Sequence, residues 1–205
     1  MGVNDLEEVQ KEIIKIFNDF SKEIEFHKEK EPQNKLKWNK YKGDIGVRIF
    51  RHYLESSLNS DYKIPEPYAY IEGFSTEFDL LIVSKKVETT EQYNNAYDPK
   101  DVKFGIEIKA HGVFGGRKEL KKAIQRIKSN FEEVKNSFPH INFLYFTFEE
   151  VMTPKRKTSI NYLTETINHL NPYEVFCLRD SRDPDIIREG EWSKLVDCVK
   201  NTLEK

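Results

Sequence analysis

The chain has 205 residues, enough for one domain, and its 38% of hydrophobic residues can supply a core. Charged residues make up 33% of the sequence, yet the formal net charge is only −2, which excludes an overall basic protein. Binding to nucleic acid would therefore depend on local basic patches and on a metal that neutralises acids. No apolar run reaches the about 18 residues of a transmembrane helix, so we expect no membrane association.

The first residues and the cysteines favour a cytoplasmic protein. The N-terminal sequence lacks the basic-then-apolar layout of a signal peptide. Cys177 and Cys198 are the two cysteines, and without C-x-x-C spacing they predict reduced thiols rather than a zinc site.

The first 40 residues or so predict a helical extension. Apolar residues recur at helical spacing over residues 4–26, which predicts an amphipathic helix whose stripe lies in the core or at a dimer seam. Residues 27–40 are highly charged and contain Pro32, which predicts a solvent-exposed link. A second helix is predicted from about residue 43 to residue 58.

Three strands are predicted next. Residues 61–83 predict two strands of a meander, 68–72 and 77–83, joined by a turn. Residues 84–101 have no clear period and predict a long hairpin loop. The third strand, residues 102–110, leads into a glycine-rich turn.

The second half alternates helices and strands. Helices are predicted over residues 117–136, 159–170 and 192–203. The nearly continuous apolar run 140–148 predicts a central strand buried on both faces, and residues 172–178 predict a last strand. The predicted order is therefore α-α-β-β-β-α-β-α-β-α.

Acidic side chains interrupt two of these apolar strands. Side chains of a strand alternate between faces, so Glu107 and Lys109 share one face of the third strand, opposite Ile106 and Ile108. In the second strand, Glu77 and Asp79 share a face with Leu81 and Val83, while Phe78, Leu80 and Ile82 point away. Buried acids need partners. A divalent metal such as Mg²⁺ can be such a partner, because carboxylate oxygens are suitable ligands for it.

Asp79 and the run Glu107-Ile108-Lys109 resemble the D…E-x-K motif of the PD-(D/E)XK nuclease superfamily, which includes many restriction endonucleases. The Pro-Asp dipeptide of that motif is absent, since Phe78 precedes Asp79. The predicted element order over about residues 43–150 also matches the core of that fold. The resemblance implies an α/β fold with a restriction-endonuclease-like core, a mixed central sheet flanked by helices, in a single nuclease-like domain over residues 1–205.

The resemblance also implies a function, a Mg²⁺-dependent endonuclease that hydrolyses phosphodiester bonds in DNA and takes part in restriction or defence. Asp79, Glu107 and Lys109 would be catalytic. Asp79, Glu107 and the backbone carbonyl of Ile108 would hold Mg²⁺, with Mn²⁺ able to substitute. Lys109 would orient or activate the attacking water, and a homodimer is a further expectation.

Two other acids are candidate metal ligands, each with a structural alternative. Glu77 lies two residues from Asp79 and is either a second ligand or a solvated residue at a strand end. The superfamily often carries a glutamate near the start of its first core helix, where this chain has Val47. Asp44 lies nearby and is either a ligand or an acid favoured by the helix dipole.

Two basic groups are candidate contacts to the DNA backbone. Arg117, Lys118 and Lys121 begin the helix after the glycine-rich turn, where backbone amides can bind phosphate. A loop contains Lys155, Arg156 and Lys157. The alternative for both groups is a solvated surface.

Two non-catalytic interpretations remain open. The chain could be an inactive nuclease-fold module that binds DNA or another partner. The acids and Lys109 could also form a cross-strand ion-pair cluster, worth about 0.2–1 kcal/mol per pair. A nuclease site needs Mg²⁺ or Mn²⁺, whereas an ion-pair cluster is indifferent to both.

Overall fold

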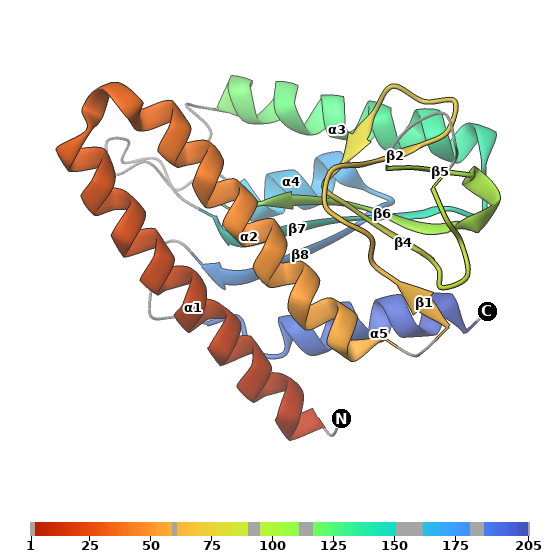
Figure 1. The fold of residues 1–205 in the computed structure, drawn as a ribbon, viewed down its shortest axis with the longest axis horizontal. Helices are drawn as coiled ribbons and strands as arrows, with labels where there is room; N and C mark the ends of the chain where they lie inside the picture. Colours follow the sequence, from red (N-terminus) through yellow and green to blue (C-terminus); the bar gives the residue numbers. More distant parts are fainter. Residues whose placement is uncertain are drawn as a thin grey trace.

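A computed structural model describes residues 3–58, 61–89, 95–110, 117–150, 162–180 and 187–204 of the chain. It is a mixed five-stranded sheet with helices on both faces, and a small second sheet lies beside it (Figure 1). This is the α/β architecture that the sequence predicts. Among the described helices, none combines the length and apolar character that crossing a bilayer requires.

The main sheet has the strand order β1-β4-β6-β7-β8. Strands β1, β4 and β6 pair antiparallel, whereas β6, β7 and β8 pair parallel. The predicted apolar strand is confirmed as β7, which lies between β6 and β8, and its side chains from Phe143 to Glu149 are buried. The strand bounds are Tyr62–Lys63 for β1, Leu80–Ser84 for β4, Val102–Lys109 for β6, Asn142–Glu150 for β7 and Glu174–Asp180 for β8.

Helices α1 (Val3–Lys30), α2 (Lys35–Ser57) and α5 (Glu191–Leu203) cover one face of the sheet. The apolar stripe of α1 lies in the core, since Ile13 and Phe17 are buried there and the Phe17 ring stacks on Phe148 at 4.3 Å. Phe50 of α2 packs against Phe146 with ring centroids 4.4 Å apart. Gln10 of α1 is also buried, and its side-chain oxygen accepts a hydrogen bond from the backbone N–H of Trp192 at the start of α5.

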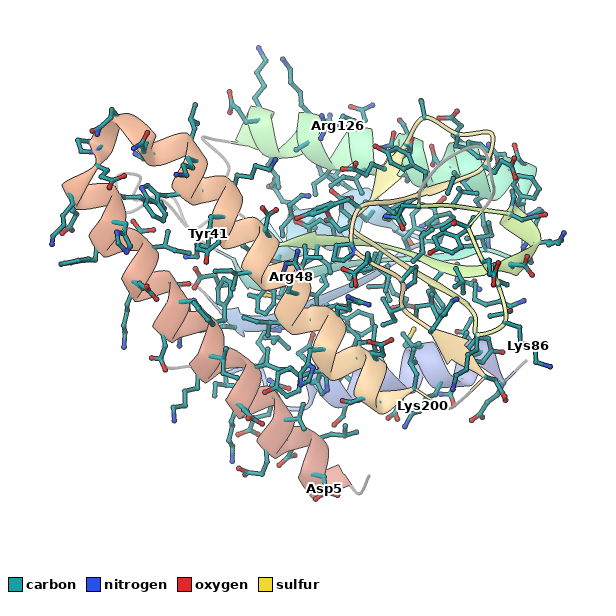
Figure 2. The ribbon with its side chains drawn as sticks, in the orientation of Figure 1. Asp5, Tyr41, Arg48, Lys86, Arg126 and Lys200 are labelled. Carbon is teal, nitrogen blue, oxygen red and sulfur yellow. The ribbon has the colours of Figure 1, made fainter. Side chains whose placement is uncertain are left out.

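Helices α3 (Arg117–Ser137) and α4 (Tyr162–Leu170) lie on the opposite face (Figure 1). In Figure 2, the labelled Arg48 lies on α2, on one side of the sheet, and the labelled Arg126 lies on α3, on the other side. The core on this side is aromatic, because the rings of Phe131 and Phe143 stack at 4.8 Å and Phe78 packs against both. Each face of the sheet therefore has its own apolar cluster.

The expected three-strand meander is wrong in one respect. Its first strand, β2 (Ala69–Ile71), belongs to the small sheet, where it pairs with β3 (Glu77–Phe78) and with β5 (Ala96–Tyr97) from the segment expected to be a loop. The strand that pairs with the outer side of β4 in the main sheet is β1 instead.

The predicted strand 77–83 is broken by a bend at Asp79, which separates β3 from β4. The bend also interrupts the alternation of faces. Phe78 packs in the same apolar cluster as Leu81 and Val83, although strict alternation places it with Leu80 and Ile82.

The predicted link over residues 27–40 is mostly helical. Helix α1 continues to Lys30, a short 3₁₀ turn spans Pro32–Asn34, and α2 begins at Lys35 rather than near Gly43. Pro32 is tolerated because it lies in the first turn, where no amide hydrogen bond is needed. Stacking between His27 and Trp38, with centroids 4.6 Å apart, joins the two arms of this helical hairpin.

Candidate active site

The candidate site forms at the end of the main sheet, where the bend at Asp79 meets the last residues of β6. Leu80 pairs with Ile106 in the antiparallel ladder, so the next position along places Asp79 beside Glu107. The amide of Ile108 donates a hydrogen bond of 2.6 Å to Oδ2 of Asp79. The bend therefore turns the Asp79 carboxylate onto the backbone of β6.

Lys109 joins the two acids. Its ammonium donates to Oε1 of Glu107 and lies 3.8 Å from Oδ2 of Asp79. The side chains of Glu107, Asp79 and Lys109 are 15%, 17% and 35% exposed, so Lys109 is the most accessible of the three. The structure thus brings together the three residues of the D…E-x-K pattern.

Burial tunes the charges at this point. Removal from water, followed by the charge of Glu107, raises the pKa of Asp79 from an ordinary value of 3.8 to about 6. Burial disfavours the charged form of Lys109, but Glu107 and Asp79 outweigh that effect and raise its pKa. Lys109 therefore stays protonated, while Asp79 gains or loses its proton near neutral pH.

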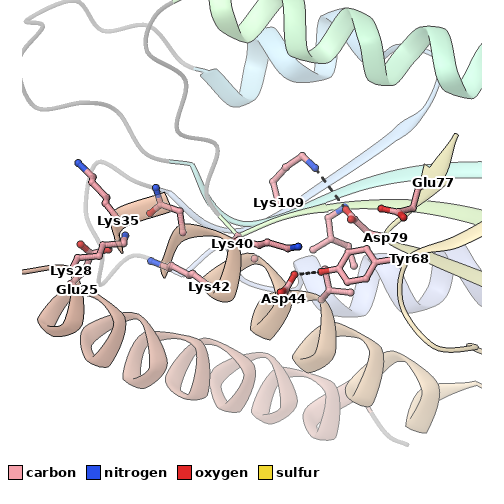
Figure 3. A pocket seen from close by; sticks show the side chains of 15 residues that line it. Glu25, Lys28, Lys35, Lys40, Lys42, Asp44, Tyr68, Glu77, Asp79 and Lys109 are labelled. Carbon is pink, nitrogen blue, oxygen red and sulfur yellow. Dashed lines mark hydrogen bonds and ion pairs between the residues drawn. The ribbon is translucent and has the colours of Figure 1, made fainter. Parts of the chain in front are cut away.

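A cavity of about 900 Å³ opens beside these residues (Figure 3). The sheet contributes Asp79, Ile108 and Lys109, and α2 contributes Asp44 and Val47. Glu107 does not line the cavity, but it pairs with Lys109, which does. The cavity is large enough to admit part of a polymeric substrate.

Asp44 faces the same cavity and accepts a hydrogen bond from the hydroxyl of Tyr68. Sequence reasoning missed Tyr68. Its backbone has φ of 65°, a left-handed conformation that a tyrosine rarely adopts. The side-chain amide of Asn95 donates to the carbonyl of Tyr68 at 2.9 Å, and the Tyr68 N–H donates to the carbonyl of Asp79 at 3.1 Å.

These contacts hold the Tyr68 side chain over the cavity, in a conformation that no local sequence signal indicates. Burial, then the hydrogen bond to Asp44, raises the pKa of the Tyr68 hydroxyl. Tyr68 is therefore a neutral donor to Asp44.

Glu77 and Val47 also line the cavity. Glu77 lines the cavity but is exposed, and its carboxylate accepts a hydrogen bond of 2.6 Å from the hydroxyl of Tyr70. Val47 is buried and lines the cavity, so this position of α2 presents no carboxylate to it.

The basic residues expected to flank the site are only partly described. Lys118 and Lys121 are exposed on α3 and do not line the cavity. The side chain of Arg117 and the segment Lys155, Arg156 and Lys157 lie outside the described residues. The lysines that do line the cavity with Lys109 come from the α1–α2 hairpin: Lys28, Lys35, Lys40 and Lys42. Sequence reasoning missed the first three of these lysines because the charges of residues 27–40 favour a solvated link.

The donor set fits a hard divalent cation in part. Within the described residues, no three acidic, histidine or cysteine side chains gather as a closed metal site. Mg²⁺ does not need one, since it is usually held by one or two carboxylates together with substrate phosphate and water. Asp79 and Glu107 supply two carboxylates against one ammonium, and the open cavity leaves room for phosphate and water.

Comparisons with known proteins show the fold. No protein-family model and no curated protein matches the sequence. A solved structure of P. aeruginosa NucC in its cAAA-bound form matches with a TM-score of 0.54 and 13% identity, over 82% of this chain and 72% of that one. E. coli NucC, also cAAA-bound, aligns with a TM-score of 0.44 and 13% identity, over 76% and 71% of the two chains. The first likeness bears out the restriction-endonuclease-like core, a mixed sheet flanked by helices.

Proposed function

We propose that this chain is a Mg²⁺-dependent endonuclease that hydrolyses phosphodiester bonds in DNA. The observation that carries the proposal is the meeting of Asp79, Glu107 and Lys109 at the mouth of one cavity, in a restriction-endonuclease-like fold. A role in restriction or defence is part of the proposal, and its support is the resemblance to a superfamily that includes many restriction endonucleases.

Asp79 and Glu107 would hold the metal, with the backbone at Ile108 beside them. When bound, Mg²⁺ would neutralise charge on the scissile phosphate and lower the pKa of a bound water; Mn²⁺ would substitute. Asp79 must ionise to act as a ligand, and a nearby cation favours the ionised form. Its raised pKa therefore predicts weak metal binding below about pH 6.

Lys109 would handle the attacking water. Its ammonium lies between the two carboxylates, so it must leave at least one of them when they engage a cation. It is the most exposed of the three side chains and lines the cavity, where it can donate to a water or to a phosphate oxygen. Its contacts with Glu107 and Asp79 hold Lys109 beside the proposed metal site.

A DNA-binding or interaction module without catalysis is the second candidate. The observation that favours it is that Lys109 already satisfies both carboxylates, as in an ion-pair cluster that needs no metal. Calorimetric titration with Mg²⁺ separates the two candidates, because heat that Glu107→Gln abolishes is expected of the nuclease alone.

Cleavage of labelled duplex and single-stranded DNA, with Mg²⁺, Mn²⁺, Ca²⁺ or a chelator, tests the proposal. We expect cleavage with Mg²⁺ or Mn²⁺ that Glu107→Gln removes. Glu133→Gln is the matched control, because Glu133 is an exposed glutamate on α3 remote from the cavity lining. Cleavage that survives the chelator, or equal rates for the two variants, would contradict the assignment.

A further inference from the structure

The cavity beside Asp79 has two ends of opposite charge. Asp44, Glu77 and Asp79 lie toward the sheet, while the other end is lined by four lysines and one acid, Glu25, of the α1–α2 hairpin (Figure 3). We call these four residues the lysine wall: Lys28, Lys35, Lys40 and Lys42. Figure 3 shows Lys40 extending from α2 toward the acids, with Lys28, Lys35 and Lys42 grouped farther away.

Two of the four lysines of the lysine wall have no acidic partner among the described residues. Lys35 and Lys40 are exposed, and neither has an ion pair within the described part of the chain. Lys28 pairs with Glu25 at 2.6 Å on the same helix. The Lys28 side chain is 12% exposed and that of Glu25 is 57% exposed, so solvent reaches this pair mainly through Glu25.

Lys42 is the exception to the usual placing of lysine, since it is 4% exposed. Its ammonium lies 3.9 Å from Glu149, but Glu149 is paired closely with Arg179. The Lys42 ammonium also lies 5.3 Å from the centroid of the Phe17 ring. A buried lysine is costly unless something offsets its charge, and Glu149 alone is shared between two cations.

Burial lowers the pKa of Lys42 to about 8; the charge of Glu25 opposes this shift, while Lys28 and Arg179 add to it. An anion entering the cavity would favour the charged form of this lysine. The packing of α1 and α2 thus holds an incompletely balanced ammonium at the cavity surface.

We propose that the lysine wall holds the backbone phosphates that flank the phosphodiester at Asp79 in a nucleic-acid strand. The inference rests on the proposed function for the identity of the strand, and it assigns the binding surface to the α1–α2 hairpin rather than to α3. A strand that crosses the cavity from the acids would pass Lys40 first, then the group of Lys28, Lys35 and Lys42.

The chemistry favours a phosphodiester polymer over a small anion or an acidic protein. Four cations along one wall match a ligand whose negative charges repeat along its length. The acids at the other end of the same cavity would repel that ligand unless a metal neutralised them, which links binding at the wall to the metal at Asp79. An acidic peptide has no phosphodiester on which a metal at Asp79 and Glu107 could act.

The test is DNA binding measured by fluorescence anisotropy, with Ca²⁺ in place of Mg²⁺ and a labelled duplex and single strand as probes. The variant is Lys35→Glu/Lys40→Glu, in which both residues are exposed and the core is untouched. The matched control is Lys15→Glu/Lys22→Glu, which makes the same charge change at exposed positions of α1 outside this cavity. Lys35→Arg/Lys40→Arg is the conservative rescue.

We expect the wall variant to bind DNA at least about tenfold more weakly than the wild type does. The salt slope of binding should fall by about two, since each of the two substituted lysines would no longer neutralise a phosphate. The control and the arginine variant should bind like the wild type. Equal losses of affinity in the wall variant and the control, tight binding of polyglutamate by the wild type, or no DNA binding by the wild type would each overturn the proposal.

Binding and cleavage separate this inference from the proposed function. If the wild type binds DNA through the lysine wall but never cleaves it with Mg²⁺, the proposed nuclease function is refuted and the proposed role of the lysine wall is not. A wild type that cleaves, with unchanged affinity in the wall variant, refutes the wall alone.

Discussion

The acidic and basic ends of the cavity are built from different kinds of structure. Asp79 lies at the bend before β4, Glu107 and Lys109 lie on the adjacent strand β6, and Lys109 pairs with both acids. Lys35 and Lys40 stand on a helical hairpin and have no ion pair among the described residues. The sheet can therefore hold reacting groups in fixed geometry, whereas the hairpin offers charge that can adapt to a ligand.

A lysine at each end gives the largest expected contrast. We expect Lys109→Ala to reduce the cleavage rate by about 10²–10⁴-fold, the range for losing a positioned acid–base group, with DNA and metal binding largely retained. Lys40→Ala should instead raise KM and leave kcat near that of the wild type, because Lys40 would contact only flanking phosphates. Steady-state cleavage kinetics at saturating Mg²⁺ separate the two effects.

An unchanged kcat in Lys109→Ala would show that Lys109 does not take part in the chemical step, and the predicted difference between the acidic and basic ends would be wrong. A fall in kcat in both variants would show that Lys40 also serves the chemistry. Calorimetric titration with Mg²⁺ checks that the Lys109 variant still binds metal.

The acidic end should also make the metal-free protein less stable as the pH rises. The unfolded chain ionises Asp79 near pH 3.8, but the folded state does so only near pH 6. Between these values the folded state binds more protons, so its stability falls as the pH rises. Asp79→Asn removes this cost, and we expect it to raise the free energy of unfolding by up to about 3 kcal/mol above pH 6.

Urea unfolding at several pH values, with a chelator present, measures this effect. The advantage of Asp79→Asn should shrink as the pH falls from 6 toward 4. A constant difference between the two proteins across that range would show that Asp79 does not carry the titration. Asp98→Asn is a suitable control, because Asp98 is a surface acid whose pKa is lowered, chiefly by Lys100.

Packing differs between the sheet and the helical hairpin as sharply as charge does. A Cβ atom at Gly105 of β6 would lie 2.7 Å from the Phe143 ring, which is buried between Phe78 and Phe131. We expect Gly105→Ala to cost about 1–3 kcal/mol of unfolding free energy, because these rings cannot move freely.

Gly43 lies on the lysine side of the cavity, in α2, and a Cβ atom there meets nothing within 4 Å. Gly43→Ala should therefore stabilise the protein by about 0.5–1 kcal/mol, as expected in a helix interior. Urea denaturation compares both variants with the wild type. Similar costs at the two glycines would mean that the hairpin is packed as tightly as the sheet.

The same contrast explains what could be predicted from the sequence. Strand β6 alternates between faces from Phe104 to Lys109, so the shared face of Glu107 and Lys109 was evident from sequence, as was the buried strand β7. The bend at Asp79 was not, because no glycine or proline marks it and the residues on both sides suit a strand. The convergence of the acids depends on that bend and on the pairing of β4 with β6.

The hairpin was missed for a different reason. The charges of residues 27–40 and Pro32 favour a solvated segment, but lysine and glutamate are also good helix formers. Contacts between distant residues, such as the stacking of His27 on Trp38, decide between the two outcomes. The left-handed backbone of Tyr68 is likewise held by Asn95, which is 27 residues away in the sequence.

Tyr68 gives the smallest expected effect and tests the boundary between the two ends. Its hydroxyl ties Asp44 of α2 to the backbone beside the sheet, so the pair fixes how the hairpin meets the acids. We expect Tyr68→Phe to cost about 1 kcal/mol of unfolding free energy, the usual value of one hydrogen bond, and to change the cleavage rate less than about threefold. Tyr70→Phe is the control, since its bond to the exposed Glu77 should be worth less than about 0.5 kcal/mol. A tenfold or larger fall in rate at unchanged stability would instead indicate that Asp44 is a metal ligand, and helix α2 would then contribute to the metal site as well as to the lysine wall.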